Sequence, residues 1–551
     1  MNNSQSGLPW WNSNPSEPTG SLILSKVPMA LLLIDLALMA SGCSEPNVPG
    51  KEQRRPNILL ALADDQSWLH TGISGDKVVK TPAFDRIARE GVLFTNAFTA
   101  CPSCTPSRTA ILSGQDIWRT REAGLLMGAM PKDLPLFTHI LDDKGFFVGY
   151  TGKGWAPGNW SCLGLGKNPL VREYNKELEK DVAYGIDTRN YAANFKDFLK
   201  DRPKDSPFFF WFGSTEPHRE YQYGVGEKEA NLKAADVEIP PFWPDNEIIR
   251  KDILDYYYEI MWYDSHLASM IDELERAGEL ENTIIIVTSD NGMPFPRAKV
   301  NLYDWGTHMP LAIRWGKNIK GGRQVDDMVS LTDLAPTILD AGGIAVPPEM
   351  TGQSLIPILK SGKNGIVDTS RDRVFTGLER HTWCRPDGAT YPSRAIRTRN
   401  YLYIRNFESD RWPTGGPEFI SSNKTTHGDV DASPTKTFIV DNRDKLPEFY
   451  RLNFGKRTEE ELYDIRKDHG QINNLINDPT CSEIRKDLRR KLTEYLEKTG
   501  DPRIEGKDPW KDYIYHQESG YGSRYNSALT IQERDRAQLR PSDHPDIKLG
   551  N

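Results

Sequence analysis

The sequence predicts an α/β protein with a large domain, built on a doubly wound mixed sheet, and a smaller C-terminal α+β subdomain. Up to residue 370, short apolar runs alternate with helical segments, a pattern typical of parallel strands buried on both faces. From Arg371 the pattern changes to shorter strand-like pieces and one amphipathic helix. The length of 551 residues also exceeds what one hydrophobic core usually serves. We therefore expect a large domain over 51–370 and a subdomain over 371–500.

The elements of the large domain follow in order along the chain. Residues 57–63 form a nearly continuous apolar run that ends in Asp64-Asp65, which predicts a buried strand with two acids at its carboxyl end. Thr81-Pro82 begins a predicted helix that continues to Glu90 and ends at Gly91. Further strands are predicted at 146–150, 207–212, 283–288 and 309–315, and helices at 252–277 and 333–341.

The C-terminal part is predicted from weaker signals. A short strand is expected at 401–405, followed by a polar insertion near 421–437. In the amphipathic helix, apolar residues recur every four positions and form one stripe that should pack on a small antiparallel sheet. These residues are Ile484, Leu488, Leu492 and Leu496. Residues 501–551 are charged and rich in turn formers, and we expect them to form a polar tail.

The composition limits the classes of partner. The formal net charge is −8, which argues against binding to nucleic acid. An anionic substrate would have to be held by basic residues that converge locally. Of the six cysteines, Cys101, Cys162, Cys384 and Cys481 have spacings that suggest neither a zinc site nor a dense disulfide framework.

An apolar run near the N-terminus predicts export. Residues 27–39 follow Lys26, are interrupted by Asp35, and lead to small residues before Cys43. The run is too short to span a bilayer comfortably and resembles a bacterial lipoprotein signal, so residues 1–50 are interpreted as an export signal and linker. A periplasmic or cell-surface location is expected, and a lipid anchor at Cys43 would be the only contact with a membrane.

The segment Cys104-Thr105-Pro106-Ser107-Arg108, followed after four intervening residues by Ser113-Gly114, is the most informative part of the sequence. It resembles the signature of type I sulfatases, in the alkaline phosphatase superfamily, in which the first residue is oxidised to formylglycine. The resemblance implies a maturing, formylglycine-generating enzyme as a partner. It also implies that a hydrated aldehyde attacks sulfur with one hydroxyl and later expels sulfate through the other. Arg108 would hold the hydrate in place. Without this signature, Cys104 would be interpreted as an ordinary buried cysteine.

Four oxygen-bearing residues predict a metal site. Asp64 and Asp65 follow one predicted strand, and Asp290 and Asn291 follow another. Their carboxylate and amide oxygens suit Ca²⁺ or Mg²⁺ better than zinc. The resemblance implies one calcium ion, to which the side chain derived from Cys104 and the bound sulfate would also belong. Asp64-Asp65 alone could equally be a turn or a helix-capping pair.

Three basic side chains follow predicted strands or the second acidic turn. Lys153, His218 and Lys299 would each be read alone as a solvated charge or a structural histidine. The resemblance implies that they surround the sulfate, with the lysines countering its charge and His218 protonating or orienting the departing group.

The sequence departs from the family pattern after Lys153. Many sulfatases have Lys-x-His where this chain has Lys153-Gly154-Trp155, so the expected histidine is absent. His70, His308 and His381 are the candidates to serve instead, and Trp155 could be a stacking surface for a sugar ring.

Further residues are predicted to contact the substrate. Glu379, Arg380, His381 and Arg394 could bind sulfates and hydroxyls, together with His308, although an interdomain salt-bridge network is an equally good interpretation. Segments 217–219, 239–244 and 289–296 resemble the heparan N-sulfatase branch, within a likeness that covers roughly 57–500. The expected substrate is a sulfated oligo- or polysaccharide, with N- and O-sulfate both open. The alternatives are a phosphatase or phosphonate hydrolase of the same superfamily, or a non-catalytic protein that binds sulfated glycans.

Overall fold

The computed structural model describes residues 54–421 and 425–516, which belong to one compact unit. The predicted export signal, Cys43 and residues 517–551 lie outside these ranges. Within them, none of the helices combines the length and the hydrophobicity that a membrane span requires.

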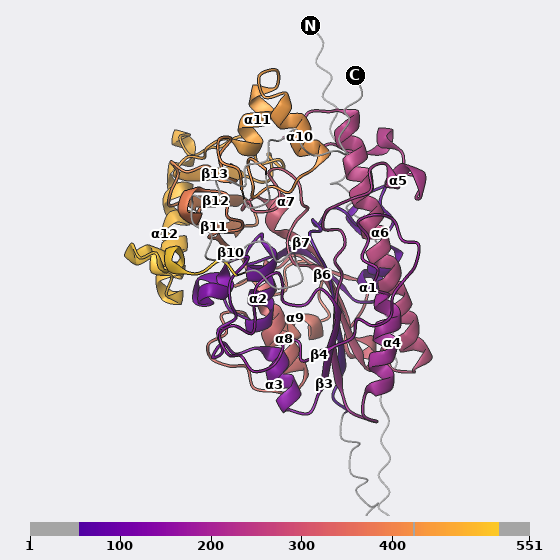
Figure 1. Ribbon diagram of the computed structural model, residues 1–551. Coiled ribbons are helices and arrows are strands. Elements are labelled where there is room, and N and C mark those ends of the chain that lie inside the picture. Colours follow the sequence, from indigo (N-terminus) through magenta and orange to yellow (C-terminus); the bar gives the residue numbers. More distant parts are fainter. Residues whose placement is uncertain (1–53, 422–424, 517–551) are drawn as a thin grey trace, which may run out of the picture. The chain divides into compact units, whose positions relative to one another are not determined.

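A large mixed sheet organises the described part of the chain, as the sequence predicts (Figure 1). Its strand order is β4-β3-β5-β1-β6-β7-β2-β8, and β9 pairs with β2. Strands β3, β5, β1 and β6 are parallel to their neighbours in this series, whereas β7 is antiparallel to both β6 and β2. The strands are β1 (Asn57–Ala63), β2 (Val92–Phe98), β3 (Phe147–Gly152), β4 (Arg172–Glu173), β5 (Phe208–Gly213), β6 (Thr283–Ser289), β7 (His308–Arg314), β8 (Arg323–Val325) and β9 (Val329–Ser330).

Strand β2 is the longest strand of the large sheet that the sequence does not predict. Its apolar run is interrupted by Thr95 and Asn96, where the pairing with β7 shifts register between Phe94 and Ala97. Because a bulge adds a residue, it breaks the regular pattern on which strand prediction depends.

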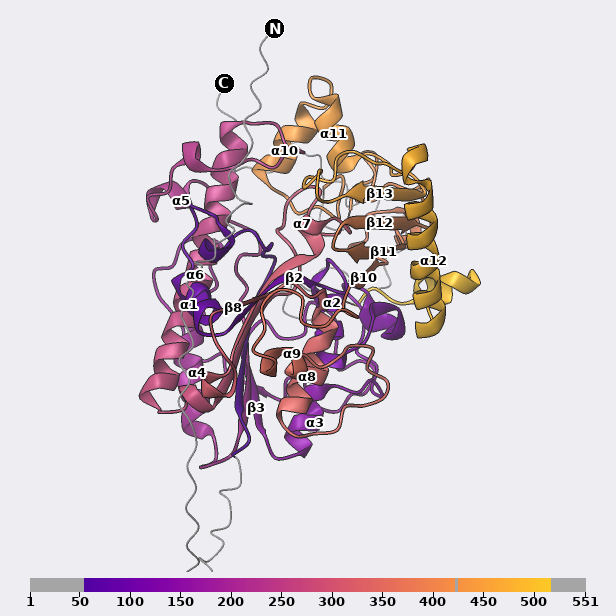
Figure 2. The ribbon, with the colours of Figure 1, turned by 180° about the vertical axis from the view of Figure 1, so that it is seen from behind.

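Helices cover both faces of this sheet, as Figures 1 and 2 show. In β1, Leu59 and Ala61 pack with α1, α4 and α6, whereas Ile58 and Leu60 face the cluster that contains α2, α3, α8 and α9. Alternation along a fully buried strand is what a doubly wound sheet requires. The helices on the first face are α1 (Pro82–Glu90), α4 (Tyr191–Asp201) and α6 (Glu247–Arg276). Those on the second face are α2 (Cys104–Ser113), α3 (Phe137–Asp143), α8 (Leu334–Ala341) and α9 (Ile356–Lys360). Shorter helices α5 (Val225–Lys228) and α7 (Asp304–Thr307) lie in connecting segments.

A second sheet occupies the C-terminal part, again as predicted. Its four strands are antiparallel in sequence order: β10 (Arg373–Leu378), β11 (Ser393–Thr398), β12 (Tyr401–Asn406) and β13 (Glu460–Asp464). Helices α10 (Pro434–Asp441) and α11 (Pro447–Phe454) lie between β12 and β13, and α12 (Ser482–Thr499) follows them. Leu488, Leu492 and Leu496 of α12 are buried in the cluster of this sheet. Burial of each stabilises the subdomain by about 1.5–3 kcal/mol.

Residues 501–516 are not part of a polar tail. Trp510 is fully buried in the cluster of the second sheet, and Asp501 and Arg503 are also buried. The prediction was wrong for residues 501–516 because their apolar content is small, while their charges pair with partners inside the fold. A local composition therefore cannot distinguish this segment from a solvated tail.

Candidate active site

The edge of the large sheet brings together the two pairs of acidic and amide residues. Strands β1 and β6 are parallel neighbours in which Ala63 pairs with Ser289, so the next residues, Asp64 and Asp290, leave the sheet side by side. The backbone N–H of Asp290 donates to the carbonyl of Ala63 at 3.1 Å. Asp65 then adopts a left-handed conformation with φ 77°, which aspartate tolerates better than most residues.

The carboxylates of Asp64, Asp65 and Asp290 form a fully buried cluster, with one oxygen of each within 4.8 Å of the others. Burial raises the pKa of Asp65 to about 7, against the opposing charge of Lys299. Burial likewise raises the pKa of Asp290 to about 7, although Arg108 opposes it. Three buried acids this close repel one another, and the cluster would gain from a bound cation.

The environment of Asn291 fits such a cation. Its Nδ2 donates to Asp65 Oδ1 at 2.6 Å, while its Oδ1 is buried and has no hydrogen-bond partner in the described ranges. An orphaned amide oxygen beside three carboxylates gives an all-oxygen donor set, which calcium and magnesium prefer. The residues present therefore fit the predicted divalent ion.

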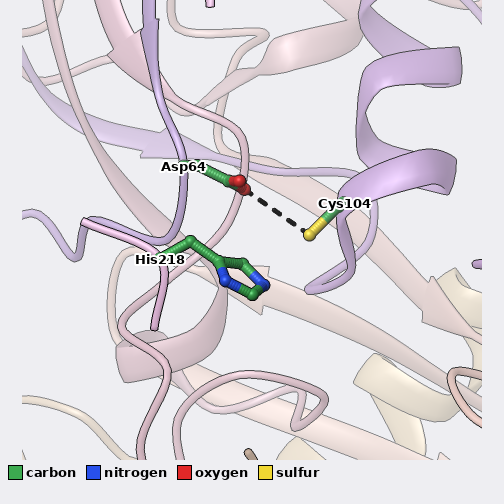
Figure 3. Close-up of side chains that lie close together, drawn as sticks. All are labelled: Asp64, Cys104 and His218. Carbon is green, nitrogen blue, oxygen red and sulfur yellow. Dashed lines mark hydrogen bonds between the residues drawn. The ribbon is translucent and has the colours of Figure 1, made fainter. Parts of the chain in front are cut away.

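Cys104 lies against this acidic cluster. It is the first residue of α2, and its Sγ is 3.5 Å from Asp64 Oδ1 (Figure 3) and 4.0 Å from Asp65 Oδ1. Burial raises the pKa of the Cys104 thiol well above its usual value. The nearby lysines would lower this pKa, but the carboxylates of the cluster counteract them. A raised pKa makes the unconverted thiol a weak nucleophile, because the thiolate is the reactive form.

Arg108 ties α2 to the other strand ends. Its Nε donates to Asp290 Oδ2 at 2.7 Å, and its Nη1 donates to the carbonyls of Lys153 and Gly154 at 2.9 and 3.0 Å. Its Nη2 is buried, lies 3.5 Å from Asp64 Oδ1, and has no hydrogen-bond partner among the described residues. This guanidinium therefore joins α2 to Asp290 and to the backbone of Lys153 and Gly154.

Two lysines extend over the acids. Lys153 Nζ contacts Asp64 Oδ2 at 2.5 Å, and Lys299 Nζ contacts Asp65 Oδ2 at 2.7 Å. Burial would raise the pKa of Asp64, but the charges of Lys153 and Arg108 outweigh it and hold that pKa below its usual range. Lys153 reaches the site because the end of β3 approaches Gly213, where a Cβ atom would lie 1.9 Å from the Lys153 carbonyl oxygen. Only glycine permits this approach.

His218 completes the group that the sequence predicts. Its Nδ1 donates to the carbonyl of Arg219 at 2.6 Å, which leaves Nε2 unprotonated in the neutral ring, 3.8 Å from Asp65 Oδ2. Burial and the charge of Lys299 lower the pKa of His218. Figure 3 shows the imidazole beside Cys104 and Asp64. The structure thus brings together nine predicted residues: Asp64, Asp65, Cys104, Arg108, Lys153, His218, Asp290, Asn291 and Lys299.

One acidic residue at the site has no sequence signal. Asp431 Oδ2 lies 3.3 Å from Lys299 Nζ, and Asp431, Asp65 and His218 have ligand-type atoms within 4.8 Å of one another. Burial alone would raise the pKa of Asp431, but the charges of Lys299, His218 and His381 outweigh it and lower that pKa. The residue comes from the polar insertion, where one aspartate among many polar residues could not be singled out.

Two predicted substrate contacts are wrong because their rings pack against and hydrogen-bond to other parts of the fold. Trp155 is 3% exposed, packs in the main core, and donates from Nε1 to Thr109 Oγ1 at 2.7 Å, so it offers no surface to a sugar. His308 is stacked between Trp68 and Phe98 and donates from Nε2 to the carbonyl of Thr95 at 2.8 Å.

Most of the C-terminal residues predicted to contact the sugar belong instead to a buried network of ion pairs and hydrogen bonds, which was the other interpretation of the sequence. Arg394 binds Asp501 at 2.6 Å and Glu379 at 2.7 Å, and Glu379 also binds Arg503 at 2.6 Å. Arg380 donates to the carbonyls of Gly388 and Tyr513 and is 2% exposed. These side chains are used inside the fold, whereas His381 reaches Ser103, the residue before Cys104.

The protein is a hydrolase of the class that comprises sulfuric ester hydrolases and sulfamidases. The chain belongs to the sulfatase family, since the family model described as "Sulfatase" matches residues 56–344. The model described as "N-sulphoglucosamine sulphohydrolase, C-terminal" matches residues 298–413. The predicted sulfatase family is thereby confirmed, and the C-terminal model matches the branch whose likeness the sequence shows.

Three relatives illustrate the similarity. Human N-sulphoglucosamine sulphohydrolase is 29% identical over 507 residues, covering 84% of this chain and 94% of the relative. An ulvan-active sulfatase from Formosa agariphila is 28% identical over 452 residues, covering 81% of each chain. The solved structure of a protein bound to its substrate D-glucosamine-2-N,6-O-disulfate has a TM-score of 0.62 and 19% identity, and covers 82% of this chain and 100% of that one.

Proposed function

We propose that this protein removes sulfate from a sulfated glycan, with bound calcium and a formylglycine formed from Cys104. The observation that carries the proposal is the position of Cys104 Sγ, 3.5 Å from a carboxylate of the buried acidic cluster. A converted residue 104 supplies a hydrated aldehyde, which is a nucleophile that a buried thiol cannot match. Conversion requires a maturing enzyme, which the signature sequence would recruit.

The surrounding side chains have complementary roles in this proposal. Asp64, Asp65, Asp290 and Asn291 would hold the calcium ion, next to position 104, and the ion would polarise the sulfate. Lys153 and Lys299 would counter the negative charge of the substrate, which the net charge of the chain would otherwise repel. Arg108 would orient the hydrate through Nη2, which lies 3.5 Å from Asp64 Oδ1 and makes no hydrogen bond to a described residue.

His218 is placed to act on the leaving group. Because Nδ1 donates to the Arg219 carbonyl, Nε2 is the nitrogen that would take up a proton and, from the imidazolium form, give it to the departing oxygen or nitrogen. The relatives named for N-sulphoglucosamine and ulvan support a sulfated sugar as substrate. The apolar run at 27–39 supports export, with the glycan met in the periplasm or at the cell surface.

The proposal is tested by product release. Protein made together with a maturing enzyme should liberate inorganic sulfate from an aryl sulfate and from at least one of defined heparin, chondroitin or ulvan oligosaccharides. The matched aryl phosphate is the control, because a phosphatase of the same superfamily would prefer it. Phosphate release faster than sulfate release would overturn the proposal, and separate N- and O-sulfated glucosamine substrates would assign the bond that is cleaved.

Calcium binding is expected to stabilise the fold even when Cys104 is unconverted. At a calcium concentration 100-fold above the dissociation constant, the free energy of unfolding should rise by about 2.7 kcal/mol. Asp290→Asn should remove most of this increment, since it replaces a buried carboxylate of the cluster. Thermal unfolding with calcium and with a chelator measures it. Asp272→Asn, an exposed position on α6, is the control that should keep the increment. Equal increments in all three proteins would contradict the metal assignment.

A further inference from the structure

The site lacks the histidine that many sulfatases carry two residues after the lysine. In this chain the position is Trp155, whose indole is buried and bonded to Thr109. Its side chain cannot exchange a proton with position 104. A group from elsewhere in the chain must therefore accept that proton if sulfate is to be released.

Two of the three candidate histidines are committed elsewhere. The Nδ1 of His70 is 3.0 Å from Tyr256 Oη, in an aromatic cluster that includes Trp305. His308 is held between two aromatic rings, with Nε2 on the Thr95 carbonyl. In the part of the chain that the structure describes, no hydrogen bond or ring contact joins either imidazole to a residue of α2.

His381 differs because it contacts the N-terminus of α2. Its Nδ1 is 2.8 Å from Oγ of Ser103, which is the residue immediately before Cys104 and the N-cap of α2. Its Nε2 makes no hydrogen bond to any residue in the described ranges. The charged groups around the ring are Asp429, Lys299, Asp431 and His218, three of which face the acidic cluster at Cys104.

The backbone on both sides of His381 is fixed. The backbone N–H and Oγ of Thr382 donate to Asp429 Oδ1 at 2.7 and 2.8 Å, and Arg385 contacts Asp429 Oδ2 at 2.9 Å. On the other side, Glu379 is held by Arg394 and Arg503. The imidazole is thus supported by a rigid loop, as a positioned base requires.

We infer that His381, supplied by the C-terminal part of the chain, replaces the absent histidine and accepts a proton at residue 104; the inference rests on the proposed sulfatase function. Ser103 Oγ can donate to or accept from the ring, and the base is the tautomer in which Nδ1–H donates to Ser103 Oγ and Nε2 carries the lone pair. Nε2 takes the proton from the free hydroxyl of residue 104, and the O–H electron pair becomes the C=O bond. The C–O bond to sulfate breaks, sulfate leaves with that electron pair, and the proton passes to water. Addition of another water restores the hydrate.

Rapid-mixing kinetics separates this role from a structural one. In converted His381→Gln, the phenol of an aryl sulfate should appear in a fast burst of about one equivalent per site, followed by turnover on the order of 10²–10⁴-fold slower than in the parent. The slow phase should be partly rescued by added imidazole. His139→Gln, which loses a remote hydrogen bond to the Asn168 carbonyl, is the control and should show no burst. Loss of burst and turnover together, or unchanged kinetics, would overturn the assignment.

A second measurement does not depend on turnover. In unconverted, calcium-loaded protein labelled with ¹⁵N-histidine, the His381 Nε2 resonance should be that of an unprotonated nitrogen at neutral pH and should shift when inorganic sulfate is added. Assignment follows from its absence in His381→Gln. If sulfate shifts the His218 resonance but not the His381 resonance, His381 lies outside the site and the inference is overturned. A parent enzyme that binds sulfate with this shift but releases none from any ester would instead count against the proposed function.

Discussion

Replacement of Cys104 by alanine is expected to abolish sulfate release. The kcat of the variant should be at least about 10⁴-fold lower than that of the converted parent. The nucleophile would be gone, and the remaining lysines, Arg108 and metal would only bind the substrate. Sulfate release from an aryl sulfate measures the loss, and mass spectrometry of the peptide that contains residue 104 confirms conversion in the parent.

The folded state provides the control for this variant. Cys104 is one small side chain at the start of α2, so Cys104→Ala should retain the calcium-dependent rise in unfolding temperature. Cys162→Ala, at an exposed cysteine far along the chain from the signature, should retain full activity. Appreciable turnover in Cys104→Ala would show that another group attacks sulfur.

The second large effect is expected at Arg394, and it concerns stability. Arg394→Leu would leave Asp501 without its partner in a fully buried position and would remove one of the two ion pairs of Glu379. Loss of one member of a buried ion pair costs about 3–5 kcal/mol, because the remaining charge is neither solvated nor compensated. Chemical denaturation followed by circular dichroism measures the change in the free energy of unfolding.

An exposed ion pair of the same chemistry is the matched control. Arg490 pairs with Glu494 and Asp487 on the solvent side of α12, where water screens the charges. Arg490→Leu should leave the midpoint of unfolding nearly unchanged. If Arg394→Leu also left the midpoint of unfolding unchanged and raised only the KM for a glycan, the interpretation of Arg394 as a sugar contact would be restored.

The same network explains a limit of prediction from sequence. Glu379, Arg394 and Asp501 are charged residues far apart in the chain, and nothing local shows that they meet in the interior. Trp155 was assigned to a sugar surface for a related reason, since an aromatic residue beside a catalytic motif is compatible with both a core and a binding wall. Its contact with Thr109 decides between them.

The sequence by itself determined the doubly wound sheet, the C-terminal sheet with its helix, and the meeting of Asp64 with Asp290. Apolar strands carry a local signal, and parallel neighbours must present their carboxyl ends at one edge, so residues that follow two such strands converge. Only the tertiary structure decided that Asp431 and His381 join that edge and that Trp155 turns away from it. Their positions depend on long loops and on packing between the two sheets, which no short window of sequence encodes.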